Sequence, residues 1–261
     1  MSYKTILVTE DPPIRTITLN RPERRNAMTQ EMQLELISVF EESAADHCCA
    51  LIVTGAGDAF CSGLDLSELQ AMREKSPAEH RVDAERLARL FLALYELPIP
   101  TIAAVNGPAI AGGTGLATLC DFTLATPGAR FGYTEVRIGF VPALVSAFLS
   151  LQIGDKHCRD LLLTGRIFGS HEALQLGLVN EIVEAADLIP RANAFARSLL
   201  ANSSQSLSAT KQLLAAQNRT RLDASIVAAM ESNAQSRESA DFREGVAAFL
   251  EKRKPVWHKK C

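Results

Sequence analysis

The first fifty residues alternate between short apolar runs and polar breaks, which predicts two strands followed by a helix. Residues 5–9 and 14–19 are separated by the turn sequence of residues 11–13, Asp-Pro-Pro, so we expect a β-hairpin. Apolar side chains then recur at helical spacing, and Thr29 is a suitable N-cap for a helix that continues to about Asp46.

Further along the chain, buried strands and helices are expected to alternate. Residues 49–54 form an uninterrupted apolar run, which indicates a strand buried on both faces. The polar stretch 67–79 is expected to be a loop, and an apolar stripe predicts a helix over 77–97. The tail has a helical pattern in three segments, near 189–201, 205–217 and 221–252.

The centre of the chain combines a glycine turn with an isolated carboxylate. An apolar strand over 102–105 is followed by a turn and by Gly112-Gly113, after which apolar residues recur as on one face of a helix. Free backbone N–H groups at a helix N-terminus favour negative charge. Glu135 follows in a polar patch, so this stretch is a candidate active site for a reaction that forms an enolate. The alternative is that the glycines serve only close packing and that Glu135 is a solvated side chain.

Composition excludes several other classes of protein. The chain has 261 residues, 47% hydrophobic and 22% charged, with a net charge of −3, which is typical of a globular protein and argues against a nucleic-acid or membrane-surface binder. It has no signal-peptide core, so we expect a cytoplasmic protein with reduced, buried cysteines and an exposed Cys261. Neither a Walker lysine nor a zinc-ligand spacing is present.

A series of separate motifs resembles the crotonase family, also called the enoyl-CoA hydratase/isomerase family. The motifs occur in order along nearly the whole chain, which is more specific than any one of them alone. They are Leu-Asn-Arg-Pro at 19–22, Asn-Ala-Met at 26–28, Ala-Phe-Cys-Ser-Gly-Leu-Asp-Leu at 59–66, Ala-Val-Asn-Gly-Pro-Ala-Ile-Ala-Gly-Gly at 104–113, Cys-Asp at 120–121, Phe-Gly-Tyr-Thr-Glu at 131–135, Leu-Thr-Gly-Arg at 163–166, Gly-Leu-Val-Asn at 177–180, Glu-Gly at 244–245 and Phe-Leu-Glu-Lys-Arg at 249–253.

The resemblance implies an α/β fold in which ββα units form a spiral of stacked sheets. This core, with the active site, would occupy residues 1–195, and residues 196–261 would form a helical oligomerisation region that builds homotrimers or dimers of trimers. Lys254 and Trp257 match positions where a neighbouring subunit closes over the ligand.

The resemblance also implies an acyl-CoA thioester substrate, with neither a separate cofactor nor a metal. The thioester oxygen would accept hydrogen bonds from the backbone N–H groups of Leu64 and Gly112, an oxyanion hole that stabilises an enolate. The segments that bind CoA would include Asn26, Ala27, Met28, Ser62, Asp65 and Leu66.

One departure from the family pattern leaves the reaction open. Hydratases of this family usually have two glutamates around one water; Glu135 matches the second, whereas Gly115 stands where the first is expected. A hydratase would then need help from Thr114 or from a carboxylate within 74–85 to hold the water, while a Δ3,Δ2-enoyl-CoA isomerase would use Glu135 alone. We favour the hydratase, a lyase, and keep the isomerase and a non-catalytic acyl-CoA-binding protein as alternatives. A glutamate placed at position 115 is expected to point toward Glu135.

Overall fold

The computed structural model describes residues 3–258, so the expectation for Cys261 lies outside the described residues. The predicted hairpin is confirmed: β1 (Ile6–Asp11) and β2 (Ile14–Leu19) pair antiparallel. The first predicted helix, α1 (Gln30–Ala45), is also confirmed, and the hydroxyl of its N-cap Thr29 accepts a hydrogen bond from the backbone N–H of Met32 at 3.2 Å.

The larger sheet has six strands in the order β1-β2-β3-β4-β6-β9. Its remaining strands, which run parallel to β2, are β3 (Ala50–Gly55), β4 (Thr101–Val105), β6 (Phe122–Ala125) and β9 (Glu181–Ile182). Leu51 and Val53 of β3 enter the main core, whereas Ile52 enters a second core on the opposite face, beneath α8 (Leu188–Leu199). The predicted burial of this strand on both faces is therefore confirmed.

A smaller sheet brings together the turns that line the candidate site. It consists of β5 (Ala109–Ile110), β7 (Arg130–Gly132) and β8 (Ile167–Gly169), strands too short to produce a recognisable sequence pattern. β5 also forms a parallel bridge from Ala109 to Cys61, in the segment after β3. This bridge aligns the segment that contains Leu64 with the glycine turn.

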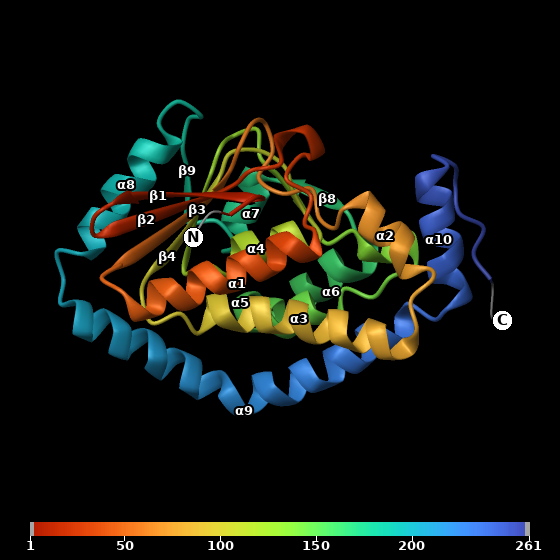
Figure 1. Cartoon of the computed structure of the whole chain (residues 1–261). Helices are drawn as coiled ribbons and strands as arrows, with labels where there is room; N and C mark the ends of the chain where they lie inside the picture. The colour runs from red at the N-terminus through yellow and green to blue at the C-terminus, as the bar shows by residue number, and fades with distance from the viewer. Residues whose placement is uncertain (1–2, 259–261) are drawn as a thin grey trace.

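Helices form a layer beneath the larger sheet (Figure 1). The long α9 (Ser204–Ser236) packs against α3 (Pro77–Tyr95) and α5 (Ala143–Gln152), and it contributes Leu222 and Ile226 to the main core. The expected break near residue 218 is absent because the stretch contains neither glycine nor proline. The other described helical segments are η1 (Pro22–Arg24), α4 (Gly112–Leu119), η2 (Glu135–Ile138), α6 (Asp155–Thr164) and α7 (Ser170–Gln175).

The expected loop at 67–79 contains a helix, α2 (Leu66–Met72), which corrects the sequence-based prediction. The helix has a short apolar face among mostly polar residues, so the sequence pattern does not indicate it. Asp65 caps its N-terminus, because its side chain accepts a hydrogen bond from the backbone N–H of Ser67 at 2.9 Å. Leu69 and Met72 are buried against α10 (Ala240–Leu250), which follows α9. None of the helices within residues 3–258 is long and apolar enough to cross a membrane.

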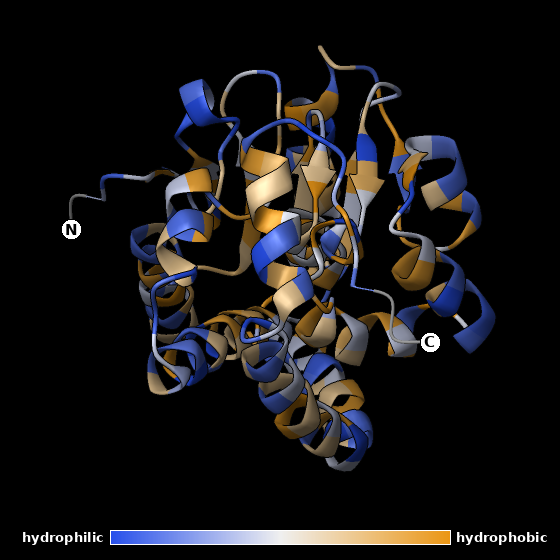
Figure 2. Cartoon of the chain, turned by 90° about the vertical axis from the view of Figure 1, so that its right-hand side faces the viewer, coloured by the Kyte–Doolittle hydropathy of each residue, from blue (hydrophilic) through white to orange (hydrophobic). Residues whose placement is uncertain are grey.

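The last helix, α10, lies directly against η2. A Cβ atom at Gly245 would stand 2.3 Å from the backbone of Ile138. A Cβ atom at Gly139, whose φ is +67°, would stand 2.3 Å from the carbonyl oxygen of Asp241. Only glycine permits this approach. Figure 2, viewed from the α10 side, shows hydrophobic strands behind helices of mixed hydropathy. The helix α10 therefore covers η2, the segment that begins with Glu135.

Candidate active site

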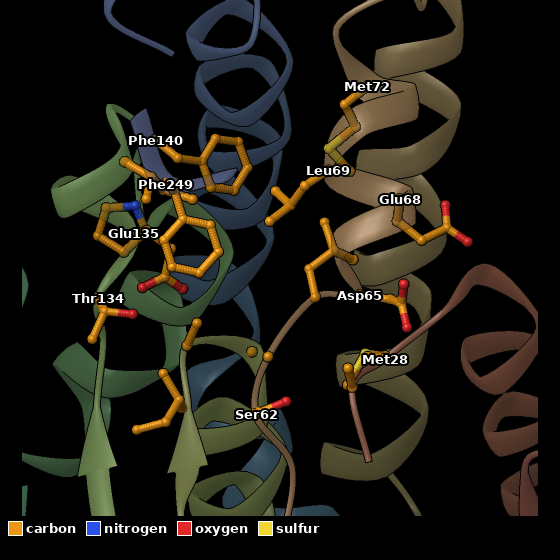
Figure 3. A pocket seen from close by; sticks show the side chains of 18 of the residues that line it. Met28, Ser62, Asp65, Glu68, Leu69, Met72, Thr134, Glu135, Phe140 and Phe249 are labelled. Atoms are coloured by element: carbon orange, nitrogen blue, oxygen red, sulfur yellow. The ribbon is translucent and has the colours of Figure 1, made fainter. Parts of the chain in front are cut away.

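A cavity of about 730 Å³ opens between α2, the start of α4, η2 and α10. Its wall combines residues from the start of the chain, the centre and the tail. In Figure 3, Glu135 and Phe249 lie on one side of the cavity and Leu69 on the other. The cavity therefore depends on long-range packing and not on one local motif.

The glycine turn borders this cavity with Ala111 and Gly112. Ala111 has φ +52°, a strained backbone conformation for alanine, and the chain turns here so that α4 begins at Gly112. The first N–H groups of a helix have no intrahelical acceptor. A Cβ at Gly112 would have no atom within 4 Å, whereas one at Gly113 would stand 2.3 Å from the carbonyl oxygen of Cys61. Gly113 thus serves packing, and Gly112 faces open space.

Leu64 lies on the facing segment in a parallel bridge with Met28. The Met28 N–H donates to the carbonyl of Gly63 at 2.7 Å, and the Asp65 N–H donates to the carbonyl of Met28 at 3.0 Å. Because successive peptide groups in an extended chain alternate direction, the N–H of Leu64 points away from Met28. Leu64 and Gly112 both line the cavity, which brings the two predicted donors to one site.

Glu135 is a buried carboxyl group in the wall of the same cavity. It is 8% exposed, and its Oε2 atom has no hydrogen-bond partner among the described residues. Burial raises the pKa of Glu135 to about 7. A carboxyl group with such a pKa can both accept and donate a proton near neutral pH. The neighbouring Tyr133 is buried and its hydroxyl contacts that of Thr118 at 3.2 Å, so this stretch is less polar than its sequence suggests.

Unlike Glu135 Oε2, the carboxylates of Asp65 and Asp83 have hydrogen-bond or ion-pair partners. Asp65 accepts from Arg21 Nη1 at 2.8 Å and from Ser67, which together lower the pKa of Asp65. In Figure 3, the carboxylates of Asp65 and Glu68 point away from Glu135. Asp83, within the predicted segment 74–85, lines the cavity but is ion-paired.

The glycine at position 115 leaves no space for a second glutamate. A Cβ there would stand 2.8 Å from Cγ1 of Val145 and 3.2 Å from Cζ of Phe91. Val145 itself lines the cavity. A glutamate at 115 would require Val145 to move first, and that its carboxylate would point toward Glu135 stays a prediction.

Thr114 is not positioned to hold a water in the cavity. Its hydroxyl is fully buried, 2.6 Å from the carbonyl oxygen of Ala109, and accepts from the Gly132 N–H at 3.1 Å. These bonds connect α4 to the smaller sheet. The sequence-based suggestion for Thr114 is thus corrected to a structural role.

The residues predicted to bind CoA lie at the cavity with one exception. Ala27, Met28, Ser62, Asp65 and Leu66 are in its wall. Asn26 is fully buried outside the wall; its Nδ2 donates to the carbonyl of Ala59 at 2.8 Å, and its Oδ1 accepts from the Arg21 N–H at 2.9 Å. Asn26 therefore fixes the loop and does not offer its side chain to a ligand.

Sequence reasoning missed several wall residues that come from distant elements. Phe249 and Arg253 lie in or just after α10 and line the cavity of their own chain. The role of Lys254 and Trp257 over a neighbouring subunit's ligand stays a prediction. Arg24 and Arg25 are exposed cations at the cavity mouth. The general basic character of the tail was the only sequence signal for Arg253.

With the geometry established, similarity to known proteins identifies the family. The enoyl-CoA hydratase/isomerase model matches residues 10–260, so the chain belongs to the enoyl-CoA hydratase/isomerase family. The predicted resemblance is confirmed.

Individual relatives agree over nearly their whole lengths. A Thermus thermophilus protein named as a candidate enoyl-CoA hydratase is 44% identical, covering 93% of this chain and 96% of the relative. The short-chain-enoyl-CoA hydratase of Clostridium acetobutylicum is 31% identical, covering 97% of each chain. The crystal structure of an enoyl-CoA hydratase/isomerase from Xanthobacter autotrophicus superimposes with a TM-score of 0.88 at 32% identity, covering 97% of this chain and 98% of that one. The predicted crotonase fold class is thereby confirmed.

The raised pKa of Glu135 predicts a pH-dependent stability difference between the wild type and Glu135→Gln. Below about pH 4.5 the carboxyl group is protonated in both the folded and unfolded states, so its ionisation has no effect on stability. Between about pH 4.5 and 7 it ionises in the unfolded state first, so wild-type stability falls relative to the variant, by at most about 3 kcal/mol. Urea unfolding of both proteins from pH 4 to about pH 8 measures this; a difference independent of pH would contradict the raised pKa.

Proposed function

We propose that this protein hydrates 2-enoyl-CoA thioesters, with Glu135 moving the proton at the carbon next to the thioester carbonyl. The observation that supports this is a buried carboxyl group whose Oε2 atom has no hydrogen-bond partner within residues 3–258, in the wall of the same cavity as Leu64 and Gly112. Water is supplied from solvent, and no separate cofactor is required by this chemistry.

The two backbone donors have a defined role in the proposed reaction. Addition of water to the β-carbon places negative charge on the thioester oxygen, where the N–H groups of Leu64 and Gly112 would stabilise it. One donor of this kind typically contributes about 3 kcal/mol to the transition state. Protonated Glu135 then gives its proton to the α-carbon and neutralises the enolate. The proton that the attacking water loses returns to the Glu135 carboxylate, directly or through solvent, and dehydration follows the reverse steps.

CoA would enter from the exposed side of the cavity. Arg24 and Arg25 at the mouth can attract its phosphates, and Ala27 and Met28 border the path inward. Gly112 leaves open space at the point where the thioester would approach. This arrangement directs the acyl group toward the inner part of the cavity.

The relatives favour hydration over double-bond migration. The Clostridium acetobutylicum relative is named a short-chain-enoyl-CoA hydratase, and a 30% identical protein from Syntrophomonas wolfei is named a crotonyl-CoA hydratase. The isomerase remains the second candidate because position 115 has no carboxylate and Val145 occupies the adjacent space.

We also propose that residues 196–261 assemble copies of this chain, as trimers or pairs of trimers. Leu213, Leu214 and Val227 of α9 are each more than half exposed. A partner surface would remove these apolar side chains from water.

Gly112→Ala is expected to retain stability but to lose catalysis. The new Cβ would enter the open space that the thioester is proposed to occupy, and alanine favours the first turn of a helix more than glycine does. We expect an unchanged or slightly higher melting temperature and at least a tenfold (about 1.4 kcal/mol) lower kcat/KM for crotonyl-CoA. Gly113→Ala is the matched control, since its Cβ meets the Cys61 carbonyl and should destabilise the fold by about 1–3 kcal/mol. Full activity in a folded Gly112→Ala protein would place the thioester elsewhere.

Glu135→Gln tests the proposed reaction itself. The amide preserves the shape of the side chain but cannot exchange a proton, so hydration of crotonyl-CoA should fall by at least about 100-fold. Affinity for CoA should persist, because the proposed CoA contacts lie at other residues. Wild type and variant are assayed separately for hydration of crotonyl-CoA and for migration of the double bond in 3-hexenoyl-CoA. Migration without hydration would replace the hydratase with the isomerase, and retained activity in the variant would remove Glu135 from either mechanism.

A further inference from the structure

The inner end of the cavity is polar, in contrast to its apolar walls. Asp83 and Arg86 reach it from α3, and Asn233 and Arg237 reach it from the C-terminal end of α9. The neighbouring wall is apolar and is formed by Leu69, Met72, Phe140 and Phe242. Exposed arginines mark the mouth, whereas Asp83, Asn233 and Arg237 are each at most 6% exposed, so we take this polar group as the inner end of the cavity.

At this end of the cavity, three cations share the carboxylate of Asp83. The Asp83 carboxylate accepts from Arg86 Nη2 at 2.6 Å, from Lys75 Nζ at 2.6 Å and from Arg237 Nη1 at 3.4 Å. One carboxylate therefore contacts three cations; Glu79 and Glu238 also lie near this cluster, but within residues 3–258 neither forms a salt bridge with Arg86 or Arg237. Lys75 lies outside the cavity wall, whereas the two arginines are part of it.

Arg237 is the least satisfied of these cations. Its side chain is 2% exposed, its distance to Asp83 is the longest of the three, and its Nε atom has no acceptor among residues 3–258. Its Nη2 donates to Oδ1 of Asn233 at 2.7 Å, and the guanidinium stands 5.4 Å from the centre of the Phe140 ring. Burial lowers the pKa of Arg237 to about 10, so the side chain remains charged at neutral pH.

A purely structural ion pair does not account for this arrangement. Lys75 and Arg86 already hold Asp83 at short distance, so Arg237 adds the cost of burying a further charge with little gain from this carboxylate. A ligand anion would bind the Arg237 guanidinium and accept a hydrogen bond from its free Nε–H. The CoA phosphates are assigned to the mouth, and the thioester to Leu64 and Gly112, so the remaining source of an anion is the far end of the acyl group.

We propose that the preferred substrates are 2-enoyl-CoA thioesters whose acyl chain ends in a second carboxylate, which binds Arg237 at the inner end of the cavity. This rests on the proposed function for the position of the thioester. An acyl group of that kind derives from a dicarboxylic acid, so the enzyme that supplies it must form or release an α,β-unsaturated dicarboxylic mono-thioester.

The test compares two substrates of nearly equal shape. In glutaconyl-CoA the chain ends in a carboxylate; in 5-methyl-2-hexenoyl-CoA two methyl groups replace the two carboxylate oxygens. The longer 2-hexenedioyl-CoA is assayed in parallel, because its carboxylate would reach Arg237 if the guanidinium lies further from the thioester. We expect the wild type to prefer a carboxylated substrate over the apolar one by at least about tenfold in kcat/KM, the range of a charge-assisted hydrogen bond.

Arg237→Met should reduce this ratio to about one, mainly through KM for the carboxylated substrate. Lys75→Met is the matched control: it removes another cation from Asp83 but none from the cavity wall, so the ratio should change by less than about threefold. Equal or better use of the apolar substrate by the wild type would overturn the proposal. An equal loss of the ratio in both variants would assign the cluster a structural role and would also overturn it.

Binding of saturated thioesters separates this proposal from that of hydration. Glutaryl-CoA and 5-methylhexanoyl-CoA cannot be hydrated, and calorimetry of the wild type should show at least about tenfold tighter binding of glutaryl-CoA, lost in Arg237→Met. This result without any hydratase activity would contradict the proposed reaction and support the carboxylate site. Hydration of crotonyl-CoA with equal binding of the two saturated thioesters would support the proposed reaction and contradict the carboxylate site.

Discussion

Glu135 is buried, and its Oε2 atom has no hydrogen-bond partner in the described part of the chain; the packing around the cavity maintains this environment. A buried carboxyl group of this kind is costly, and the cost appears as a pKa raised to about 7. The close packing of α10 on η2, permitted by Gly139 and Gly245, excludes water from one side of the carboxyl group. Packing far from the reacting atoms thus sets the proton affinity on which the proposed chemistry depends.

The proposed oxyanion hole consists of backbone groups, so its geometry depends on how two chain segments are held together. The bridges from Met28 to Leu64 and from Cys61 to Ala109 align these segments. Gly113 permits the close approach, and the strained backbone of Ala111 turns the chain into α4. The side chain of Leu64 has no part in the proposed donor role, so a leucine is compatible with this position.

The parts of the site that depend on local motifs were predictable from the sequence. The glycine turn, the segment at Leu64 and the position of Glu135 all follow recognisable patterns, and the strands buried on both faces follow from their apolar runs. The smaller sheet was missed because strands of two or three residues have no detectable alternation.

Features that require distant segments to meet were not predictable. Nothing near Gly115 indicates that Val145 fills the adjacent space, and nothing near Arg237 indicates that the end of α9 meets Asp83 of α3. Asn26 was assigned to CoA because it lies in a family motif, whereas its hydrogen bonds show that it supports the loop. A match to a family motif does not distinguish a residue that contacts the ligand from one that supports the backbone.

The central claim is that Glu135 and the two backbone donors together remove and return an α-proton. Exchange of the α-protons of butyryl-CoA with deuterium oxide, followed by proton NMR, tests this without requiring water addition or double-bond migration. We expect the wild type to exchange one of the two α-protons, because Glu135 faces only one side of the bound thioester, and Glu135→Gln to show no exchange above the uncatalysed rate. No exchange in the wild type, or equal exchange in the variant, would contradict the account.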